Sequence, residues 1–371
     1  MNERPMGDPY QHDDPFNINN NLPFGNQKDY TAPFRINADD LMKRTLEQFA
    51  EEEHKKGILS LRTFDQWMEI AKNEPIPKML FSEFWHEGEL CILFSDTNLG
   101  KSVLGIQIGN SISNGKPIPG FKLEADMQPV VYFDFEMAKK QLEVRYTNNY
   151  EDHFIFNSNF YRAEIDTDED IPDGMDFEEC LSSSLERVII EIKAKVLIID
   201  NITYLRNETE KAKDALPLMK QLKALKQKYN LSILAMAHTP KRDKAKPITR
   251  NDLQGSKMLI NFCDSAFAIG EDANDGTIRY LKQIKQRNTS QVYGDKNVCV
   301  CRVNKPYNFL QYEFTGFGKE NDYLRDRTDD EEEKLLRQVS ELHSAGKTLR
   351  EIGAELGISY SKAHRLLKDN D

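Results

Sequence analysis

The stretch ELCILFSDTNLGKS, residues 89–102, sets the main expectation for this chain. It opens with a short apolar run typical of a buried strand and continues through a turn-rich loop into a helical segment. Gly100-Lys101-Ser102 completes the phosphate-loop pattern of a glycine, four residues and Gly-Lys-Ser/Thr, except that Ser95 stands where the first glycine is usual. The flanking strand and helix favour a phosphate site over an ordinary loop with a chance Gly-Lys-Ser.

Each part of this loop suits a nucleoside triphosphate and its metal ion. Gly100 lets the backbone come close to the phosphates, and N–H groups at the start of a helix bind them. Lys101 brings a positive charge to the outer phosphates, and the Ser102 hydroxyl is a ligand for Mg²⁺. We therefore expect ATP and Mg²⁺ as ligands, with ATP contacts from Ser95, Asp96, Thr97, Asn98, Leu99, Gly100, Lys101 and Ser102.

Two carboxylates at the ends of apolar runs are candidates for the chemistry. Asp200 ends the run KVLIID, so its carboxylate is expected at the carboxyl edge of a sheet, where open α/β sheets bind ligands, and there it can hold Mg²⁺. Glu136 ends VVYFDFE and is placed to polarise the water that attacks the γ-phosphate. Asp134, two residues back, is the alternative base. An ordinary strand-end charge or helix cap is the alternative role for Asp200 and Glu136.

Strand-like and helical segments alternate through the middle of the chain. This alternation predicts an α/β fold with a mostly parallel sheet flanked by helices, and the closely spaced last strands suggest antiparallel hairpins. The expected strands are 89–94, 130–135, 154–165, 195–200, 231–238, 265–270, 277–285 and 297–303, and the expected helices are 101–112, 177–192 and 215–229.

Composition narrows the class of protein further. Of 371 residues, 39% are hydrophobic and 30% charged, and the net charge of −11 argues against a surface coated with nucleic-acid contacts. The segment Lys241–Lys257 is nevertheless locally basic. No apolar run approaches the roughly 20 residues that span a bilayer, and the first residues do not resemble a secretory signal. We expect a cytoplasmic protein without a membrane partner.

The five cysteines argue against a disulfide framework, because their number is odd and they are scattered. Cys299 and Cys301 share one face of an expected strand. We expect them to be small buried residues; a metal or redox site is the alternative.

Composition also divides the chain. Residues 1–36 are rich in Asn, Asp, Pro and Gln and are expected to be a disordered arm. Residues 37–84 are expected to hold a surface helix over Ala38–Lys56, then a short helix and a connector, and 85–318 to form the ATPase core. Residues 319–330 are expected to be an acidic linker.

The last part, 331–371, resembles a small helix-turn-helix module. We expect helices to about residue 345, over 349–356 and over 361–367, with Gly357 ending the second and Ser359 capping the third. In DNA-binding versions the third helix enters the major groove, where Lys362 and Arg365 would meet DNA. The module is nearly neutral, so a protein-binding or oligomerising role is the alternative.

The residues at 95–102, 136 and 200 together resemble those of RecA-like ATPases, and more closely those of hexameric helicases of the RepA and DnaB type. In RecA-like proteins the catalytic acid lies on the strand after the phosphate-loop helix, as Glu136 does. In the AAA+ family it usually follows the metal-binding aspartate directly, whereas Asn201 follows Asp200. We see no helical N-terminal domain of the DnaB kind, so the RepA type is closer. The resemblance covers roughly Phe64–Phe317 and departs from the family in the missing first glycine and in a long insertion between residues 136 and 200.

This resemblance assigns roles to the segments that follow. Ala237–Lys241 is similar to the RepA-type motif in which a polar side chain, here His238, senses the γ-phosphate; a structural histidine is the alternative. Asp252–Ser256 resembles the loop that these helicases place facing the central channel. The cations expected to contact a DNA backbone there, unless the segment is only a solvated loop, are Lys241, Arg242, Arg250 and Lys257.

Lys285 and Arg287 resemble the Lys-x-Arg element of DnaB-type helicases. In that family both cations reach the nucleotide site of the neighbouring subunit, as an arginine finger in trans. Alternation along a strand puts both on one face. The resemblance therefore implies a homo-oligomer, a hexamer as in that family, and an edge-strand charge pair is the alternative.

Three hypotheses of function follow. The first is an ATP-driven motor on DNA, a RepA-like helicase of a mobile element or replicon. The second is a regulatory ATPase that oligomerises with ATP and binds DNA without unwinding it. The third is a RecA-like recombination or defence factor that assembles on a partner protein. Strand displacement on a forked duplex separates the first from the others.

Overall fold

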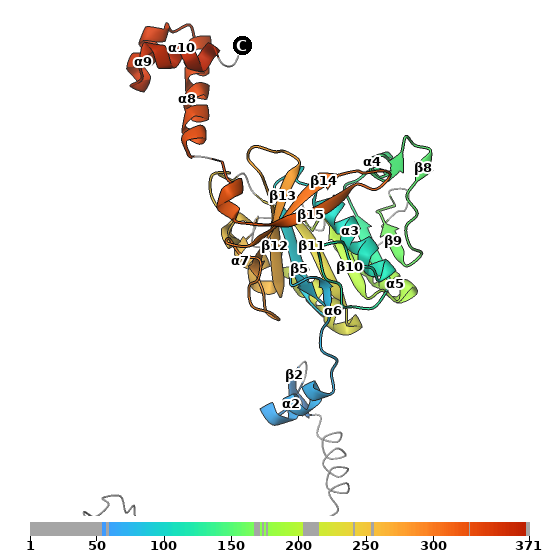
Figure 1. The fold of residues 1–371 in the computed structure, drawn as a ribbon. Helices are drawn as coiled ribbons and strands as arrows, with labels where there is room; N and C mark the ends of the chain where they lie inside the picture. Colours follow the sequence, from blue (N-terminus) through green and yellow to red (C-terminus); the bar gives the residue numbers. More distant parts are fainter. Residues whose placement is uncertain are drawn as a thin grey trace, which may run out of the picture. The chain divides into compact units, whose positions relative to one another are not determined.

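A mixed β-sheet runs through the core of the protein in the computed structural model (Figure 1). The structure describes residues 54–56, 59–166, 171–172, 174–175, 177–202, 215–239, 242–253, 256–325 and 327–368. Within them, the sheet has nine strands. They are β5 (Leu90–Ser95), β6 (Val130–Asp134), β9 (Phe160–Ala163), β10 (Val196–Asp200), β11 (Ser232–His238), β12 (Ser265–Glu271), β13 (Ile278–Lys285), β14 (Val298–Asn304) and β15 (Gln311–Gly318).

The strand order is β15-β14-β13-β12-β5-β11-β10-β6-β9. The six strands from β12 to β9 pair in parallel, and β12 to β15 pair as antiparallel neighbours. The prediction of an α/β fold with a mostly parallel sheet is confirmed, as is the antiparallel pairing of the last strands. The sequence did not predict β15.

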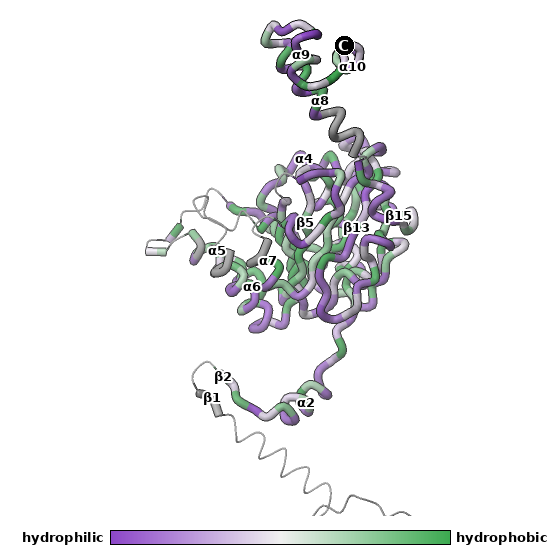
Figure 2. The backbone as a smooth tube through the Cα atoms, turned by 90° about the vertical axis from the view of Figure 1, so that its left-hand side faces the viewer, coloured by the Kyte–Doolittle hydropathy of each residue, from purple (hydrophilic) through white to green (hydrophobic). Residues whose placement is uncertain are grey.

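Helices cover both faces of this sheet. Along β5, Leu90, Ile92 and Phe94 face one layer, and Cys91 and Leu93 face the other, because successive side chains alternate. The first layer is built by α5 (Phe177–Ile192), α6 (Ala215–Tyr229) and α7 (Ser256–Phe262), and the second by α3 (Lys101–Asn114). Figure 2 shows that α5 and α6 carry both hydrophobic and hydrophilic residues, as helices on a sheet surface do. None of the helices in the described ranges is long and apolar enough to cross a bilayer.

The core begins earlier than expected. A hairpin of β3 (Met79–Phe81) and β4 (Trp85–His86) packs on the α3 side of the sheet. Phe81, Phe84 and Trp85 are fully buried there, and Phe84 packs against Phe267 of β12. The prediction that a connector runs to residue 84 is therefore wrong at its end, because these aromatic side chains are part of the core.

The chain divides into two compact units, Met1–Pro75 and Ile76–Asp371. In the first, Thr63 caps the predicted short helix, α2 (Phe64–Lys72), with Gln66 in a reciprocal capping box. Strand β1 (His54–Lys56) pairs with β2 (Leu59–Leu61), so the surface helix predicted to reach residue 56 is wrong at that end. The rest of that helix and the arm at 1–36 lie outside the described residues.

At the other end, three helices form a small module around their own apolar cluster. They are α8 (Arg327–Ser344), α9 (Leu349–Leu356) and α10 (Tyr360–Lys368), close to the predicted bounds. Val339, Ile352 and Leu366 pack together at the centre of the cluster. Gly357 ends α9 in the left-handed conformation, and the Ser359 hydroxyl accepts the backbone N–H of Lys362 at 3.2 Å.

Four of the cysteines are buried, and all five are free thiols. Burial raises the pKa of Cys301 to about 12 and that of Cys263 to about 11. Among the described residues no group of three or more His, Cys, Asp or Glu side chains is placed to hold a metal ion. The geometry therefore favours the reading of Cys299 and Cys301 as packing residues.

Part of the segment predicted to be an acidic linker belongs to the core. Glu320, at the start of a short 3₁₀ turn (Glu320–Tyr323), is fully buried. Its carboxylate accepts the Lys282 ammonium at 2.5 Å and the backbone N–H of Ile248 at 2.7 Å. A buried carboxylate requires such partners, and a count of acidic residues along the chain does not reveal them.

The Glu320–Lys282 pair gives a prediction about stability. Glu320→Ala leaves a buried ammonium without its counter-charge, so we expect a loss of about 3–5 kcal/mol in the free energy of unfolding, measured with urea. The control, Glu313→Ala, removes an exposed carboxylate of β15 and should cost less than about 1 kcal/mol. Equal losses in the two variants would show that the buried pair does not stabilise the core.

Candidate active site

The predicted phosphate loop connects β5 to α3. Ser95 is the last residue of β5 and is paired with His238 of β11, so its backbone is that of a regular strand. The left-handed conformations occur later in the loop, at Asn98 (φ 62°) and Gly100 (φ 90°). The local backbone at residue 95 therefore does not require glycine, which is a structural account of the serine there.

Tyr312 of β15 fixes the end of this loop. Its hydroxyl donates a hydrogen bond to the carbonyl of Leu99. A Cβ on Gly100 would lie 2.9 Å from the hydroxyl oxygen of Tyr312. The side-chain amide of Gln107 on α3 accepts the backbone N–H of Tyr312 at 2.8 Å and donates to its carbonyl at 3.0 Å. Glycine at 100 is thus required both by its φ and by the close tyrosine. Sequence reasoning missed Tyr312, and no local motif marks it.

Lys101 is the centre of the site. Its side chain is buried, with the residue only 6% exposed, and its ammonium donates to the carbonyls of Ser95 and Asp96 at 3.2 and 3.1 Å. It also lies 3.3 Å from Ser95 Oγ and 3.1 Å from His238 Nδ1. Burial lowers the pKa of Lys101, and the nearby carboxylates of Asp200, Glu136 and Asp96 oppose that shift.

Asp200 ends β10 beside this ammonium and is 1% exposed. Its carboxylate accepts the Tyr132 hydroxyl at 2.6 Å and a hydrogen bond from Ser102. Burial raises its pKa, and these two hydrogen bonds counteract the rise. A serine hydroxyl next to a carboxylate is an all-oxygen donor set of the kind that holds Mg²⁺ together with substrate phosphates, so these residues fit the ion.

Glu136 and His238 complete the cluster. The Asn201 side-chain amide donates to Glu136 Oε1, and His238 Nε2 lies 3.6 Å from the same oxygen. A lysine that donates to His238 Nδ1 leaves the ring proton on Nε2, facing Glu136. The nearby His238, the Asn201 amide and Lys101 lower the pKa of Glu136, and burial opposes that shift.

Asp134, the alternative base, is engaged elsewhere. Its carboxylate accepts the backbone N–H groups of Glu136 and Met137 at 3.2 and 2.9 Å, and Arg162 Nε at 2.9 Å. These bonds shape the turn after β6. The geometry therefore favours Glu136 for the role next to Lys101.

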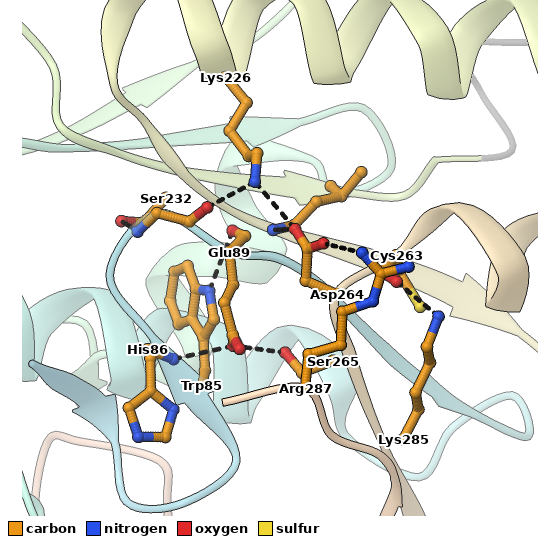
Figure 3. Close-up of polar contacts among 12 residues, drawn as sticks. Trp85, His86, Glu89, Lys226, Ser232, Cys263, Asp264, Ser265, Lys285 and Arg287 are labelled. Atoms are coloured by element: carbon orange, nitrogen blue, oxygen red, sulfur yellow. Dashed lines mark hydrogen bonds and ion pairs between the residues drawn. The ribbon is translucent and has the colours of Figure 1, made fainter. Parts of the chain in front are cut away.

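Lys285 and Arg287 are not in this cluster. They lie at the opposite, amino edge of the parallel strands, near Asp264 at the start of β12 (Figure 3). Asp264 donates its backbone N–H to Leu90 O, at the first residue of β5, whereas the loop follows Ser95 at the other end. At about 3.3 Å per residue those two ends are roughly 17 Å apart, which is beyond the reach of a side chain.

The residues predicted to contact DNA are placed separately. Arg242 donates to the carbonyl of Lys246 at 2.9 Å, and Arg250 Nε to that of Ile284 at 3.4 Å. Lys362 and Arg365 are exposed, one turn apart on α10. Lys241, the side chain of Lys257 and part of the predicted channel loop lie outside the described residues.

Tyr132 gives a prediction for the site. Tyr132→Phe removes a hydroxyl that holds Asp200 in place, so we expect the Mg²⁺ concentration for half-maximal ATPase activity to rise about tenfold. The control is Tyr146→Phe, because the buried Tyr146 hydroxyl has no hydrogen-bond partner among the described residues. A Mg²⁺ titration that gives the same midpoint for Tyr132→Phe as for the unaltered protein would contradict the role.

Comparison with known proteins identifies the core domain. The family described as "AAA domain" matches residues 59–244, which contain the phosphate loop, Glu136, Asp200 and His238. Glu136 follows β6, the strand after α3, by two residues, and the residue directly after Asp200 is Asn201. No curated protein matches the chain.

Among solved structures, a KaiC-like protein from the hyperthermophilic archaeon Pyrococcus horikoshii is similar, with 14% sequence identity and a TM-score of 0.43 over 62% of this chain and 90% of that one. The match to the family covers half of the 371 residues. The chain therefore belongs to the AAA domain family and carries a RecA-like P-loop ATPase domain.

Proposed function

We propose that this protein is an ATP-hydrolysing motor of the RepA-like helicase type, which acts on DNA as a ring-shaped homo-oligomer, a hexamer as in the helicases it resembles. One observation carries the proposal. The groups for hydrolysis gather at the carboxyl edge of the sheet, while Lys285 and Arg287 lie at the amino edge of the same sheet. Subunits that meet edge to edge bring the two sets together, and one chain alone does not.

Hydrolysis in this proposal is divided among the residues of the carboxyl edge. Lys101 binds the outer phosphates after exchanging the carbonyls of its own loop for phosphate oxygens. Glu136 orients the attacking water and accepts its proton. His238 lies next to both of these side chains, which supports a role for it in sensing the γ-phosphate. Ser102 and Asp200 would hold Mg²⁺, which would neutralise phosphate charge when bound.

The nucleic-acid part of the proposal rests on cations outside this cluster. Arg242 and Arg250 lie in the locally basic segment that follows His238, the last residue of β11. On α10, Tyr360 is 53% exposed and stacks on His364, beside the exposed Lys362 and Arg365. This basic and aromatic face supports DNA contact by a helix-turn-helix module. It equally supports the second candidate, a regulatory ATPase that binds DNA through this module without unwinding it.

Glu136 separates hydrolysis from binding. Glu136→Gln keeps the size of the side chain and removes the base, so we expect ATP hydrolysis to fall by 10²- to 10⁴-fold or so, with ATP affinity within about threefold. The measurements are steady-state hydrolysis and titration with a fluorescent ATP analogue. Glu143→Gln, a carboxylate on α4 (Lys139–Arg145) that pairs with Lys140 and His153 and lies outside the cluster around Lys101, is the control and should leave both unchanged.

Unwinding of a forked DNA duplex then distinguishes the candidates. The motor hypothesis predicts strand displacement by the unaltered protein with ATP and none by Glu136→Gln. It also predicts closed rings in electron micrographs with a non-hydrolysable ATP analogue. ATP-dependent DNA binding without any unwinding would favour the regulatory ATPase, and a persistent monomer would contradict the in-trans site.

A further inference from the structure

Two cations at the amino edge of the sheet are held by one short segment, Cys263–Asp264, which links α7 to β12 (Figure 3). Asp264 Oδ1 accepts Arg287 Nη1 at 3.0 Å. The Cys263 carbonyl accepts the Lys285 ammonium at 2.7 Å. Lys285 and Arg287 therefore contact consecutive residues of the same linker, but Lys285 binds a backbone carbonyl and Arg287 binds a carboxylate.

Asp264 is itself rigidly held. Its Oδ2 accepts the backbone N–H of Leu90 and the Lys226 ammonium, both at 2.9 Å, and its side chain is 14% exposed. Burial opposes ionisation, but the Leu90 N–H and Lys226 keep the pKa of Asp264 below its ordinary value. A charged, fixed carboxylate thus stands next to Arg287, anchored to the first residue of β5 and to α6.

Lys285 has a different environment. Its ammonium donates to the carbonyls of Ile260, in the last turn of α7, and Cys263, the residue after α7, at 2.5 and 2.7 Å. These bonds turn the side chain inward, onto its own subunit. The Arg287 side chain, by contrast, is 51% exposed.

We propose that Arg287 is the cation that reaches the phosphates of the neighbouring subunit's nucleotide, and that Asp264 and Lys285 are positioning residues that hold it in place. This inference rests on the proposed function and sharpens it, since the sequence motif alone gives Lys285 and Arg287 the same role. Asp264 fixes the guanidinium through one nitrogen, and Lys285 fixes the end of α7 and hence the linker that carries Asp264.

This arrangement leaves Arg287 able to act. A guanidinium has five N–H donors, and the bond to Asp264 uses one nitrogen, Nη1, so the remaining fork can bind a phosphate in a bidentate manner. Holding a cation in advance also reduces the ordering cost that the transition state would otherwise carry. We therefore expect loss of Asp264 to lower kcat and to leave KM for ATP nearly unchanged.

The test uses mixed oligomers of the full-length chain. Arg287→Ala subunits keep Glu136 but supply no finger, and Glu136→Gln subunits supply the finger but do not hydrolyse ATP. Mixing the two should restore ATPase activity at interfaces where a Glu136→Gln subunit serves an Arg287→Ala site. Adding Asp264→Asn to the Glu136→Gln subunit should lower the recovered kcat about tenfold or more, with KM changed less than about twofold.

A matched control tests whether the effect is merely structural. Lys226→Met removes the other ion pair of Asp264 but leaves the Arg287 pair and the Leu90 N–H bond, so in the same Glu136→Gln subunit it should lower the recovered kcat much less than Asp264→Asn does. Thermal unfolding of each variant checks that both are folded, and Asp264→Glu provides a conservative variant that should recover part of the activity if Asp264→Asn proves unstable.

Lys285 has its own readout. Lys285→Met in the Glu136→Gln subunit should lower the recovered kcat and also speed amide hydrogen exchange at the end of α7. Its effect and that of Asp264→Asn should be less than additive, because both act through Arg287. Lost activity with unchanged exchange at α7 would overturn the positioning role and return Lys285 to phosphate contact.

The outcomes separate the two proposals. No recovery on mixing Arg287→Ala with Glu136→Gln would defeat the in-trans function itself. Normal recovery with that pair, and equally normal recovery when Asp264→Asn is added, would leave the motor intact and overturn the role of Asp264. An equal loss with Lys226→Met and Asp264→Asn would show that the network stabilises the edge without positioning Arg287.

Discussion

The carboxyl edge of the sheet is organised around one buried ammonium, that of Lys101. Its desolvation is balanced by backbone carbonyls of its own loop and by the nearby charges of Asp200 and Glu136. These groups meet because β5, β6, β10 and β11 are parallel neighbours whose carboxyl ends reach the same edge. The strand order, the shape of the loop and the charges of the two acids are therefore linked. Each of them helps to offset the free-energy cost of burying the Lys101 ammonium.

Local sequence patterns were sufficient for the elements that carry this cluster. The apolar runs before Ser95, Asp200 and His238 are intense because parallel strands are covered on both faces, and the phosphate-loop motif is contiguous. Patterns failed where the stabilising contact is distant in sequence. The hairpin at residues 79–86 depends on aromatic packing against β12, and Glu320 depends on Lys282, so neither could be recognised from neighbouring residues.

The two cations of the Lys-x-Arg element show a related limit. Strand periodicity predicts that Lys285 and Arg287 share a face, but side-chain direction also depends on which acceptors lie nearby. Carbonyls at the end of α7 bind the Lys285 ammonium, and the fixed carboxylate of Asp264 binds Arg287. Strand periodicity also stops applying here, because β13 ends at Lys285 and Arg287 lies beyond it. The motif alone does not predict these two different environments, because Asp264 lies more than twenty residues before it in the sequence.

The bond between Tyr312 and Leu99 has a consequence for how the protein matures during synthesis. The phosphate loop emerges from the ribosome more than two hundred residues before the tyrosine that fixes its shape. A nascent chain that ends at residue 244 contains every residue of the family match but not β15. The phosphate loop is thus completed late in translation, and an incomplete chain holds Lys101, Glu136 and Asp200 before it has the tyrosine that fixes the loop.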